Sequence, residues 1–398
     1  MTCSPSTSWK NNEHYYPWEE AFIHDFITSL NLQALADHAN QLRDRNDATI
    51  RTDVFSRGQE NLVLEVEFGE GEYWVARIQL PASRPPAPFP GFDRKQHSYK
   101  SKAELLSEIV TMKYIKSHTN IPVPEVYGFC AEENNAVGAM YVFMAGGTGQ
   151  LLDLLPKIPD QFKHSVYSQY AAIILELSSL QWPNIGLLQH NGEEFSISTS
   201  IIEEYYRFPA FSTSQAFYTN RAKNFLLHKV KEGNEDWITF AWVCLQATKK
   251  FLQPKWNLGP FPLRHPDLNN CNVLFDENYK ITSVIDWTAT SAMPMESFLA
   301  TPTDFHYHQF VDEKNHFIDI FEEVEKSRKG TAPFAQFMRS NACRIVEIVD
   351  QYASYGGFPQ YDAERLMRLL YEDGIQWVDL KVLCREWLDN NKSFEMGK

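Results

Sequence analysis

The stretch HPDLNNCNVLF, residues 265–275, places a histidine, an aspartate and three asparagines directly before the apolar run Val273–Phe275. Carboxylates and carboxamides are costly to pack against an apolar strand, because a buried polar group without a partner loses its hydrogen bonds to water. Beyond turn-forming residues at 276–280, the run ITSVIDW (281–287) is typical of a second strand that ends near Asp286. The two runs predict a short hairpin with polar residues gathered at one end.

Asn272 and Asp286 are expected at the same end of this hairpin, because the chain leaves along one strand and returns along the other. Amide and carboxylate oxygens suit Mg²⁺, which keeps several waters and shares its other positions with substrate phosphates. The order His-x-Asp-x-x-x-x-Asn, two strands and Asp is the layout of a kinase-like phosphoryl-transfer site. The alternative is that Asp267, Asn269 and Asn270 only cap a turn, as each of them alone would do more often than catalyse.

On these residues the sequence resembles the aminoglycoside phosphotransferase family of the protein-kinase-like superfamily, over about residues 55–302. The resemblance implies an α+β, bilobal protein-kinase-like fold. Its N-lobe would be a mixed antiparallel sheet with one main helix, and its C-lobe would be mostly helical. The expected parts are an N-terminal helical extension (1–50), the N-lobe (51–144) and the C-lobe (145–398), which carries the catalytic loop 265–272.

Hydrophobic periodicity predicts the elements of these parts. Helical spacing runs from residue 18 to about 42, after a polar start that is expected to be frayed. A β-hairpin is expected at 62–80 around the turn GEGE, followed by a proline-rich loop at 81–93. Further strands are expected at 121–130 and 139–147, and further helices at 102–117, 159–181, 236–252, 333–354, 362–372 and 375–388.

The resemblance assigns several N-lobe residues to nucleotide binding. The loop FSRGQEN, with Ser56 and Gly58, would cover the phosphates. Arg77 in the strand WVAR stands where the family usually carries a lysine that contacts the α- and β-phosphates. A guanidinium also grips phosphate, but it is bulkier and not interchangeable with an ammonium group. Its partner would be Glu108 of the following helix, although Glu104, one turn earlier, could also face the sheet.

The strand YVFMAGG resembles the hinge at which adenine bonds to backbone groups, here those of Phe143, Met144 and Ala145. The same residues fit an ordinary buried strand equally well. His265 is expected to orient the catalytic loop by hydrogen bonds and not to act as the general base. Pro266 stands where protein kinases carry an arginine that reads a phosphate on the activation loop, so that mode of control is expected to be absent.

These assignments imply in-line transfer of the ATP γ-phosphoryl group to a hydroxyl of a small molecule, with ATP and Mg²⁺ as cofactors. Asp267 would position the hydroxyl and take its proton, and Asn272 and Asp286 would hold the metal. The link from Asp286 to the Pro-x-Glu at 294–296 is short for a segment that docks a peptide, which argues against a protein kinase. The alternative is a catalytically silent kinase-like nucleotide-binding module, favoured by Arg77 and the glycine-poor loop.

The composition limits the partners of the chain. Thirty-seven basic against 51 acidic residues give a net charge of −14, which argues against general nucleic-acid binding. The charge is compatible with a cationic acceptor, and equally with simple solubility. Six scattered cysteines without zinc spacing indicate reduced thiols. The absence of an apolar signal core or a long apolar run predicts a cytoplasmic protein without membrane contact, of unknown oligomeric state.

The acceptor itself is not identified by the sequence. Acidic and aromatic side chains after residue 300 could line a pocket for an amine, but solvated helix faces such as IFEEVEK explain them better. The residues concerned are Asp304, Asp312, Glu313, Glu322, Glu323, Glu325, Trp377 and Trp387.

Overall fold

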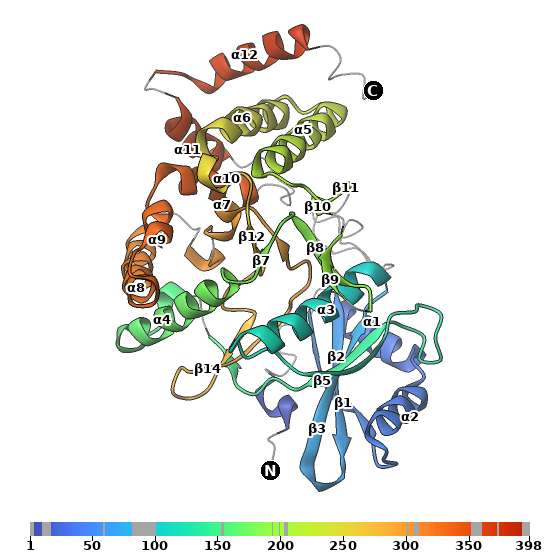
Figure 1. Cartoon of the computed structure of the whole chain (residues 1–398). Coiled ribbons are helices and arrows are strands. Elements are labelled where there is room, and N and C mark those ends of the chain that lie inside the picture. Colours follow the sequence, from blue (N-terminus) through green and yellow to red (C-terminus); the bar gives the residue numbers. More distant parts are fainter. Residues whose placement is uncertain are drawn as a thin grey trace. The chain divides into compact units, whose positions relative to one another are not determined.

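Figure 1 shows the helices and strands of the computed structural model. The chain divides into two compact units. The first unit consists of Met1–Glu176, Leu188–Ser196 and His265–Thr290. The second unit consists of Leu177–Leu187, Ile197–Arg264 and Ser291–Lys398. The residues that the structure describes are 4–9, 17–58, 60–81, 101–152, 155–192, 194–198, 200–202, 206–300, 302–305, 310–351, 360–371 and 374–391. The predicted domain boundaries at residues 50 and 144 remain a prediction.

An antiparallel sheet of five strands lies in the first unit, in the order β1-β2-β3-β5-β4. Its strands are β1 (Thr49–Arg57), β2 (Asn61–Phe68), β3 (Glu72–Gln79), β4 (Val126–Cys130) and β5 (Tyr141–Ala145). The predicted hairpin is formed by β2 and β3, which are joined by a 3-10 turn, η2 (Gly69–Gly71). β4 is shorter than the predicted strand 121–130, because Pro122 and Pro124 in its first half have no N–H to donate to a ladder.

One face of this sheet is apolar. Residues Leu62, Leu64 and Val66 alternate along β2 and therefore point to the same side. They join a hydrophobic cluster with buried residues of two helices, α1 (Pro17–Ser29) and α2 (Leu32–Arg43). These helices are the expected N-terminal helical region, and they cover the apolar face. The polar residues of β2 and β3 therefore lie on the opposite face of the sheet.

The N-terminal region differs from the prediction in two ways. The single helical stretch is two helices, because the side chain of Asn31 caps α2 by accepting the Ala34 N–H at 3.1 Å. The expected frayed start is wrong for residues 4–9, which form a 3-10 turn, η1 (Pro5–Ser8), held against the sheet. Hydrogen bonds to Glu65 order this segment, and the polar sequence alone does not indicate them. Apart from residue 81, the predicted proline-rich loop lies outside the described residues.

A three-stranded sheet, in the order β14-β13-β6, carries the second predicted hairpin. Its strands are β6 (Gln150–Leu151), β13 (Val273–Phe275) and β14 (Ile281–Val284). The unit also contains α3 (Lys102–His118), η4 (Leu155–Lys157) and α4 (Asp160–Leu177). Gln169 of α4 accepts the Ile281 N–H at 2.8 Å and donates to the Tyr279 carbonyl at 2.9 Å, so the helix fixes the hairpin.

The second unit is mostly helical. Its helices are α5 (Ser214–Glu232), α6 (Glu235–Phe251), α7 (Met295–Phe298), α8 (Val311–Lys329), α9 (Pro333–Met338), α10 (Asn341–Gln351), α11 (Gln360–Leu370) and α12 (Trp377–Asn390). Two 3-10 turns are η5 (Pro254–Trp256) and η6 (Thr303–Phe305). The remaining short strands, two of which continue into stretches of the first unit, are β7 (Gln181–Trp182), β8 (Gly186–His190), β9 (Phe195–Ile197), β10 (Ser200–Ile202), β11 (Tyr206–Phe208), β12 (Phe261–Arg264) and β15 (Ser291–Ala292).

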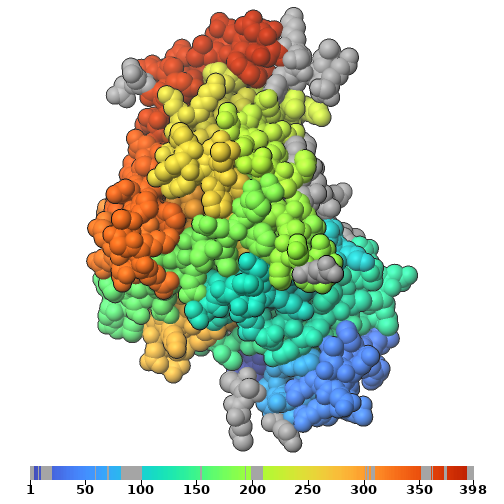
Figure 2. All heavy atoms as spheres, in the orientation of Figure 1, coloured from blue at the N-terminus to red at the C-terminus, as the bar shows by residue number. Residues whose placement is uncertain are grey.

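Two helical predictions need correction in this unit. The expected helix 333–354 is interrupted between α9 and α10, where Ser340 Oγ accepts the Cys343 N–H at 3.2 Å and starts a new helix. α5 was not predicted, although Thr213 caps its start and Gly233 its end. α12 packs on α6 (Figure 2). Trp377 Nε1 of α12 donates to Asp236 of α6 at 2.9 Å. No helix in the described ranges is both long and apolar enough to cross a bilayer.

Candidate active site

The hairpin of β13 and β14 brings the predicted polar residues to one end. Val273 pairs with Val284, and the Ile285 N–H then donates to the Asn272 carbonyl at 2.9 Å. Asp286 directly follows Ile285 in the chain, so it lies at the same end of the hairpin as Asn272. This is the juxtaposition that the motif spacing predicts.

Two side-chain amides hold the Asp267 carboxylate. Asn269 Nδ2 donates to Oδ1 at 2.6 Å, and Asn272 Nδ2 donates to Oδ2 at 2.9 Å. Asn272 Nδ2 also donates to the Asp267 carbonyl at 2.8 Å. Asn272 is buried, whereas Asp267 is exposed. The carboxylate is therefore fixed in orientation but remains accessible to a reacting molecule.

His265 connects the loop to the end of β14. Its Nδ1 accepts the Asp267 N–H at 3.2 Å, so the ring proton lies on Nε2, which donates to the Ile285 carbonyl at 3.0 Å. The ring is buried and packs edge-on against Trp287, with centroids 4.7 Å apart. These contacts use both ring nitrogens for positioning. They leave no nitrogen for proton abstraction, and the orienting role of His265 in catalysis remains a prediction.

Asp286 has an unusual backbone conformation. Its φ of +59° lies in the left-handed region, which aspartate tolerates better than most residues with a Cβ atom. The residue is exposed. β14 ends at Val284, so Asp286 lies two residues beyond the strand and outside its ladder. Such a conformation at the end of a polar motif is common at functional sites.

A buried ion pair on the sheet joins Arg77 of β3 to Glu108 of α3. Nη1 donates to Oε1 at 2.7 Å, and Nη2 lies 2.7 Å from Oε2, with side chains 11% and 0% exposed. Burial by itself would lower the pKa of the Arg77 guanidinium. The charge and hydrogen bond of Glu108, together with the charges of Asp286 and Glu60, outweigh burial, so the pKa is raised above its ordinary value. The guanidinium therefore stays cationic. The Asp286 charge acts on the same group that the resemblance assigns to phosphate.

The open choice between the two glutamates of α3 is settled by the structure. Glu104 accepts the Ser101 N–H at 2.6 Å and forms a capping box at the start of the helix. Glu108, one turn later, faces the sheet and pairs with Arg77. The predicted partner of the cation is therefore the one observed.

The predicted phosphate loop is a tight turn between β1 and β2. Ser56 pairs with Val63, which in turn pairs with Arg77, so these three residues form one row across the sheet. The Gly58 N–H donates to the Asn61 carbonyl at 2.9 Å. The row places Ser56 on the face of Arg77, because directly opposite residues of antiparallel strands share a face. A role of Ser56 and Gly58 in phosphate binding remains a prediction.

The predicted adenine contacts lie inside a strand with two neighbours. Met144 of β5 pairs with Val75 of β3 and with Val126 of β4, and Phe143 lies in the same two ladders. The Ala145 N–H donates to the Glu125 carbonyl at 2.8 Å. Ladder bonds thus compete for the backbone groups of Phe143, Met144 and Ala145, and their assignment to adenine remains a prediction.

Two glycines directly after β5 are site candidates that the sequence reading missed. A Cβ atom at Gly146 would lie 2.1 Å from Pro5 Cγ, and one at Gly147 would lie 2.5 Å from Leu274 Cδ1. A side chain at either position would displace its neighbour, so glycine lets both the N-terminal turn and the hairpin approach the strand end. The sequence feature that could have indicated this close approach is the pair of glycines at the end of the apolar run 141–145.

Asn269 and Asn270 are two further positioning residues. Asn269 holds Asp267 and also accepts the Cys271 N–H at 2.9 Å, so it caps a turn as well. Asn270 Nδ2 donates to the Leu152 carbonyl at 2.9 Å and anchors the loop beside β6. A residue of this loop can therefore cap a turn and also hold the Asp267 carboxylate, as Asn269 does. The sequence contained the residues, but not which of them would reach the aspartate.

The donor set at this end of the hairpin fits a hard divalent cation. Asn272 directs its amide nitrogen to Asp267, which leaves its amide oxygen pointing elsewhere, and Asp286 adds an exposed carboxylate. Among the described residues, no three His, Cys, Asp or Glu side chains gather as metal ligands. A site with one amide and one carboxylate suits Mg²⁺, whose remaining positions are taken by water and phosphate.

Two of the acidic side chains considered for an acceptor pocket, Glu325 and Glu322, have structural partners. Glu325 is buried and accepts the N–H groups of Phe334 and Ala335 at the start of α9. Glu322 forms ion pairs with Lys326 and Arg339. These contacts agree with helix stabilisation as the explanation for this part of the acidic cluster.

Comparison with known proteins shows what this chain is similar to. The family model described as the phosphotransferase enzyme family matches residues 52–296. Subtelomeric hrmA-associated cluster proteins from two strains of Aspergillus fumigatus are each 27% identical over 171 residues. That match covers 42% of this chain and 30% of each relative, so less than a third of the relatives' length is matched.

Solved structures establish the fold. A candidate aminoglycoside phosphotransferase of Ralstonia eutropha has a TM-score of 0.56 at 13% identity, covering 92% of this chain and 98% of its own. A candidate fructosamine-3-kinase of Thermobifida fusca has a TM-score of 0.50 at 15% identity, covering 84% and 98%. The predicted α+β protein-kinase-like fold is therefore confirmed.

Proposed function

This chain belongs to the phosphotransferase enzyme family, and from that premise we propose that it transfers the γ-phosphoryl group of ATP to a hydroxyl of a small molecule. The observation that carries the proposal is the meeting of Asp267, Asn272 and Asp286 at one end of a single hairpin. A turn cap needs one of these residues, whereas a phosphoryl-transfer site needs all three.

Asp267 acts as the group that orients the acceptor hydroxyl and takes its proton. Its carboxylate is held by Asn269 and Asn272, so it does not have to reorganise when the acceptor binds. A hydroxyl within about 2.6–3.2 Å of one oxygen would be aligned for attack on phosphorus. His265 supports this geometry through its bond to the Asp267 N–H.

Arg77 and the metal-binding residues act on the phosphates. The guanidinium, held by Glu108, would contact the α- and β-phosphates, and the ion pair fixes its position before the nucleotide arrives. Asn272 and Asp286 would hold Mg²⁺. The bound ion would neutralise charge on the bridging phosphate oxygens. Arginine in place of the usual lysine keeps the charge and can form two parallel bonds to phosphate.

The acceptor is a small molecule in this proposal. The short link between Asp286 and the helix at Met295–Phe298 has no room for a peptide-docking segment. The Ralstonia and Thermobifida proteins are named for aminoglycoside and fructosamine acceptors, which supports a small hydroxylated compound. The net charge of −14 is compatible with a cationic one. A cytoplasmic location, without nucleic-acid or membrane partners, completes the proposal.

Measurement of ADP release with Mg·ATP and a library of small hydroxylated acceptors tests the proposal. We expect turnover with at least one acceptor, and no turnover with generic protein substrates. A thermal shift with Mg·ATP but no turnover on any acceptor would favour the silent nucleotide-binding module. No thermal shift and no turnover would exclude both.

A further inference from the structure

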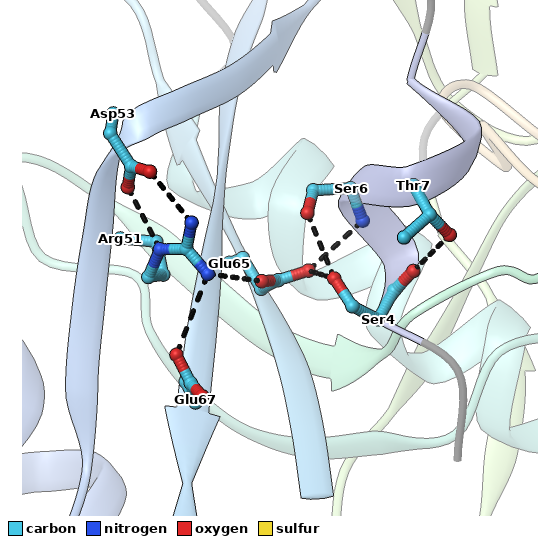
Figure 3. A network of polar contacts seen from close by, with 7 residues as sticks. All are labelled: Ser4, Ser6, Thr7, Arg51, Asp53, Glu65 and Glu67. Carbon is cyan, nitrogen blue, oxygen red and sulfur yellow. Dashed lines mark hydrogen bonds and ion pairs between the residues drawn. The ribbon is translucent and has the colours of Figure 1, made fainter. Parts of the chain in front are cut away.

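The N-terminal strap, defined as residues Ser4–Trp9, is bonded to a buried carboxylate of the sheet. Ser4 Oγ donates to Glu65 Oε2 at 2.5 Å, and the Ser6 N–H donates to the same oxygen at 2.9 Å (Figure 3). Ser4 and Ser6 also share a hydrogen bond of 2.8 Å between their hydroxyls. Glu65 is 0% exposed. A carboxylate buried this completely needs donors, and the strap supplies two of them.

The strap lies on the same face of the sheet as Arg77. Glu65 pairs with Val75, which is two residues before Arg77 on β3. Residues opposite one another, and residues two apart along a strand, share a face. The neighbours of Glu65 on β2, Leu64 and Val66, point instead into the hydrophobic cluster on the other face. Glu65, Arg77 and the strap therefore occupy the polar face, where the proposed function places the nucleotide.

A second contact places the strap at the end of β5. Pro5 is buried, and its Cγ lies 2.1 Å from the position of a Cβ atom on Gly146. Gly146 directly follows Ala145, the last residue of the strand assigned to adenine. The strap thus touches the sheet at Glu65 and again at the predicted hinge.

The two contacts overlap the path that a nucleotide would take. Arg77 pairs with Val142 of β5, and the next row on the same face contains Glu65, Val75 and Met144. With its phosphates at Arg77 and its adenine at the end of β5, a nucleotide must cross this row. The strap already covers the row at Glu65 and the strand end at Gly146. Strap and adenine therefore compete for one place.

We propose that the N-terminal strap is an autoinhibitory segment, which occupies the adenine part of the nucleotide site and is displaced when ATP binds. The inference rests on the proposed function, because it takes the nucleotide site from there. It adds a regulated step, since only those molecules whose strap is displaced can bind the nucleotide. The apparent dissociation constant rises as the fraction of such molecules falls.

The sheet is built so that Glu65 keeps a partner when the strap leaves. Arg51 Nη1 lies 3.6 Å from Glu65 and 3.5 Å from Glu67, and Arg51 also bonds to both oxygens of Asp53 at 2.8 and 2.6 Å (Figure 3). One guanidinium is thus shared by three carboxylates. Without the strap Glu65 retains an ion pair, although it loses two hydrogen bonds. Both states of the segment are accordingly accessible.

Binding of a non-hydrolysable ATP analogue with Mg²⁺, measured by calorimetry, tests the strap without any need for an acceptor. Removal of residues 1–9 should tighten binding by about tenfold, because the competent fraction then approaches one. In the full chain, Glu65→Gln should tighten binding by roughly threefold through a weakened acceptor for Ser4 and Ser6. Glu67→Gln is the matched control, since it removes a carboxylate near Arg51 that does not bond the strap, and it should leave the affinity unchanged.

Two further measurements protect the test against an unfolding artefact. A thermal melt without nucleotide checks that the truncated chain is folded. Glu65→Gln in the truncated chain should add little further gain in affinity for the analogue, because truncation and substitution act through the same contact. In the full chain, exchange of the Ser6 amide hydrogen should be slow alone and faster with the analogue. Amide protection follows the bond to Glu65, so its loss reports displacement.

Equal affinities of the full and truncated chains would overturn the strap and leave the proposed function standing. Weaker binding after truncation would also overturn it, because the segment would then be part of the site. Failure of every form to bind the analogue would overturn the proposed function and the strap together. Tighter binding by the truncated chain and by Glu65→Gln, with an unchanged Glu67→Gln, supports the strap.

Discussion

The two ends of the β13–β14 hairpin use the same residue types for different purposes. At the closed end, Asp276 Oδ1 accepts the N–H groups of Asn278 and Lys280, each at 2.9 Å, so the carboxylate serves the backbone of its own turn. At the open end, Asp267 accepts two side-chain amides and remains exposed. An aspartate that closes its own turn stabilises a fold, whereas one held by other side chains can meet a ligand.

The same substitution, Asp to Asn, can therefore be applied at both ends of one hairpin. At the closed end it removes charge from a turn whose amide hydrogen bonds an asparagine can still accept. At the open end it removes the group that takes a proton or binds a cation. The predictions below separate these outcomes, beginning with the largest effect.

Asp267→Asn should lower kcat by about 10²–10⁴-fold with little loss of nucleotide affinity, because it removes the proton acceptor but leaves the phosphate contacts in place. Steady-state ADP release and analogue binding measure the two quantities. Glu277→Gln, an exposed carboxylate of the closed end, is the matched control and should turn over like the wild type. Wild-type turnover by Asp267→Asn would mean that the open end has no catalytic role.

His265→Gln should lower kcat by about 10- to 100-fold, because the loop loses its bridge between Asp267 and the Ile285 carbonyl and its geometry relaxes. The nucleotide KM should change less than kcat, which marks a positioning residue. His38→Gln serves as a control, since His38 is also bonded, to Tyr141 at 2.7 Å, but away from the hairpin. Equal losses in both variants would point to a general loss of stability.

Asp286→Asn should weaken nucleotide binding by about tenfold, about 1.4 kcal/mol, when Mg²⁺ is present. It should have little effect when the metal is removed with EDTA. Asparagine tolerates the left-handed backbone of this position, so the change acts on charge and not on strain. Titration of the analogue with and without Mg²⁺ gives the two affinities. A loss of the same size without metal would show that Asp286 does not act through the cation.

Asp276→Asn should lower the free energy of unfolding by about 1 kcal/mol, because the two backbone bonds at the closed end pass from a charged to a neutral acceptor. Its kcat should stay within about twofold of the wild type. Urea unfolding and the ADP assay measure the two effects. A large loss of activity here would erase the contrast between the ends, since both would then be needed for chemistry.

The spacing of polar and apolar residues was enough to predict this hairpin, the strands β2 and β3, and the approach of Asn272 to Asp286. Each of these depends on local alternation and on a short turn, which neighbouring residues determine. Arg77 and Glu108 were paired correctly only through the resemblance. Helical spacing left Glu104 as an alternative, and the capping box at Ser101 removed it.

Other features depended on contacts between distant residues. Asn31 and Ser340 divide predicted helices, and the effect of a cap depends on whether its side chain meets the free N–H groups. The strap is the largest such case, because residues 4–9 are polar and resemble a frayed end. Their structure comes from Glu65 and Gly146, which lie more than fifty residues further along the chain.

The sequence by itself determined the kinase-like motif, the alternation of the sheet and the order of the site residues, because these are properties of neighbouring positions and of spacing. Only the tertiary structure decided which two amides hold Asp267, which glutamate meets Arg77, and that the N-terminal strap lies over the face assigned to the nucleotide. The physical reason is that hydrogen bonds and ion pairs act over a few ångströms in space. Separation along the chain does not show which groups come that close.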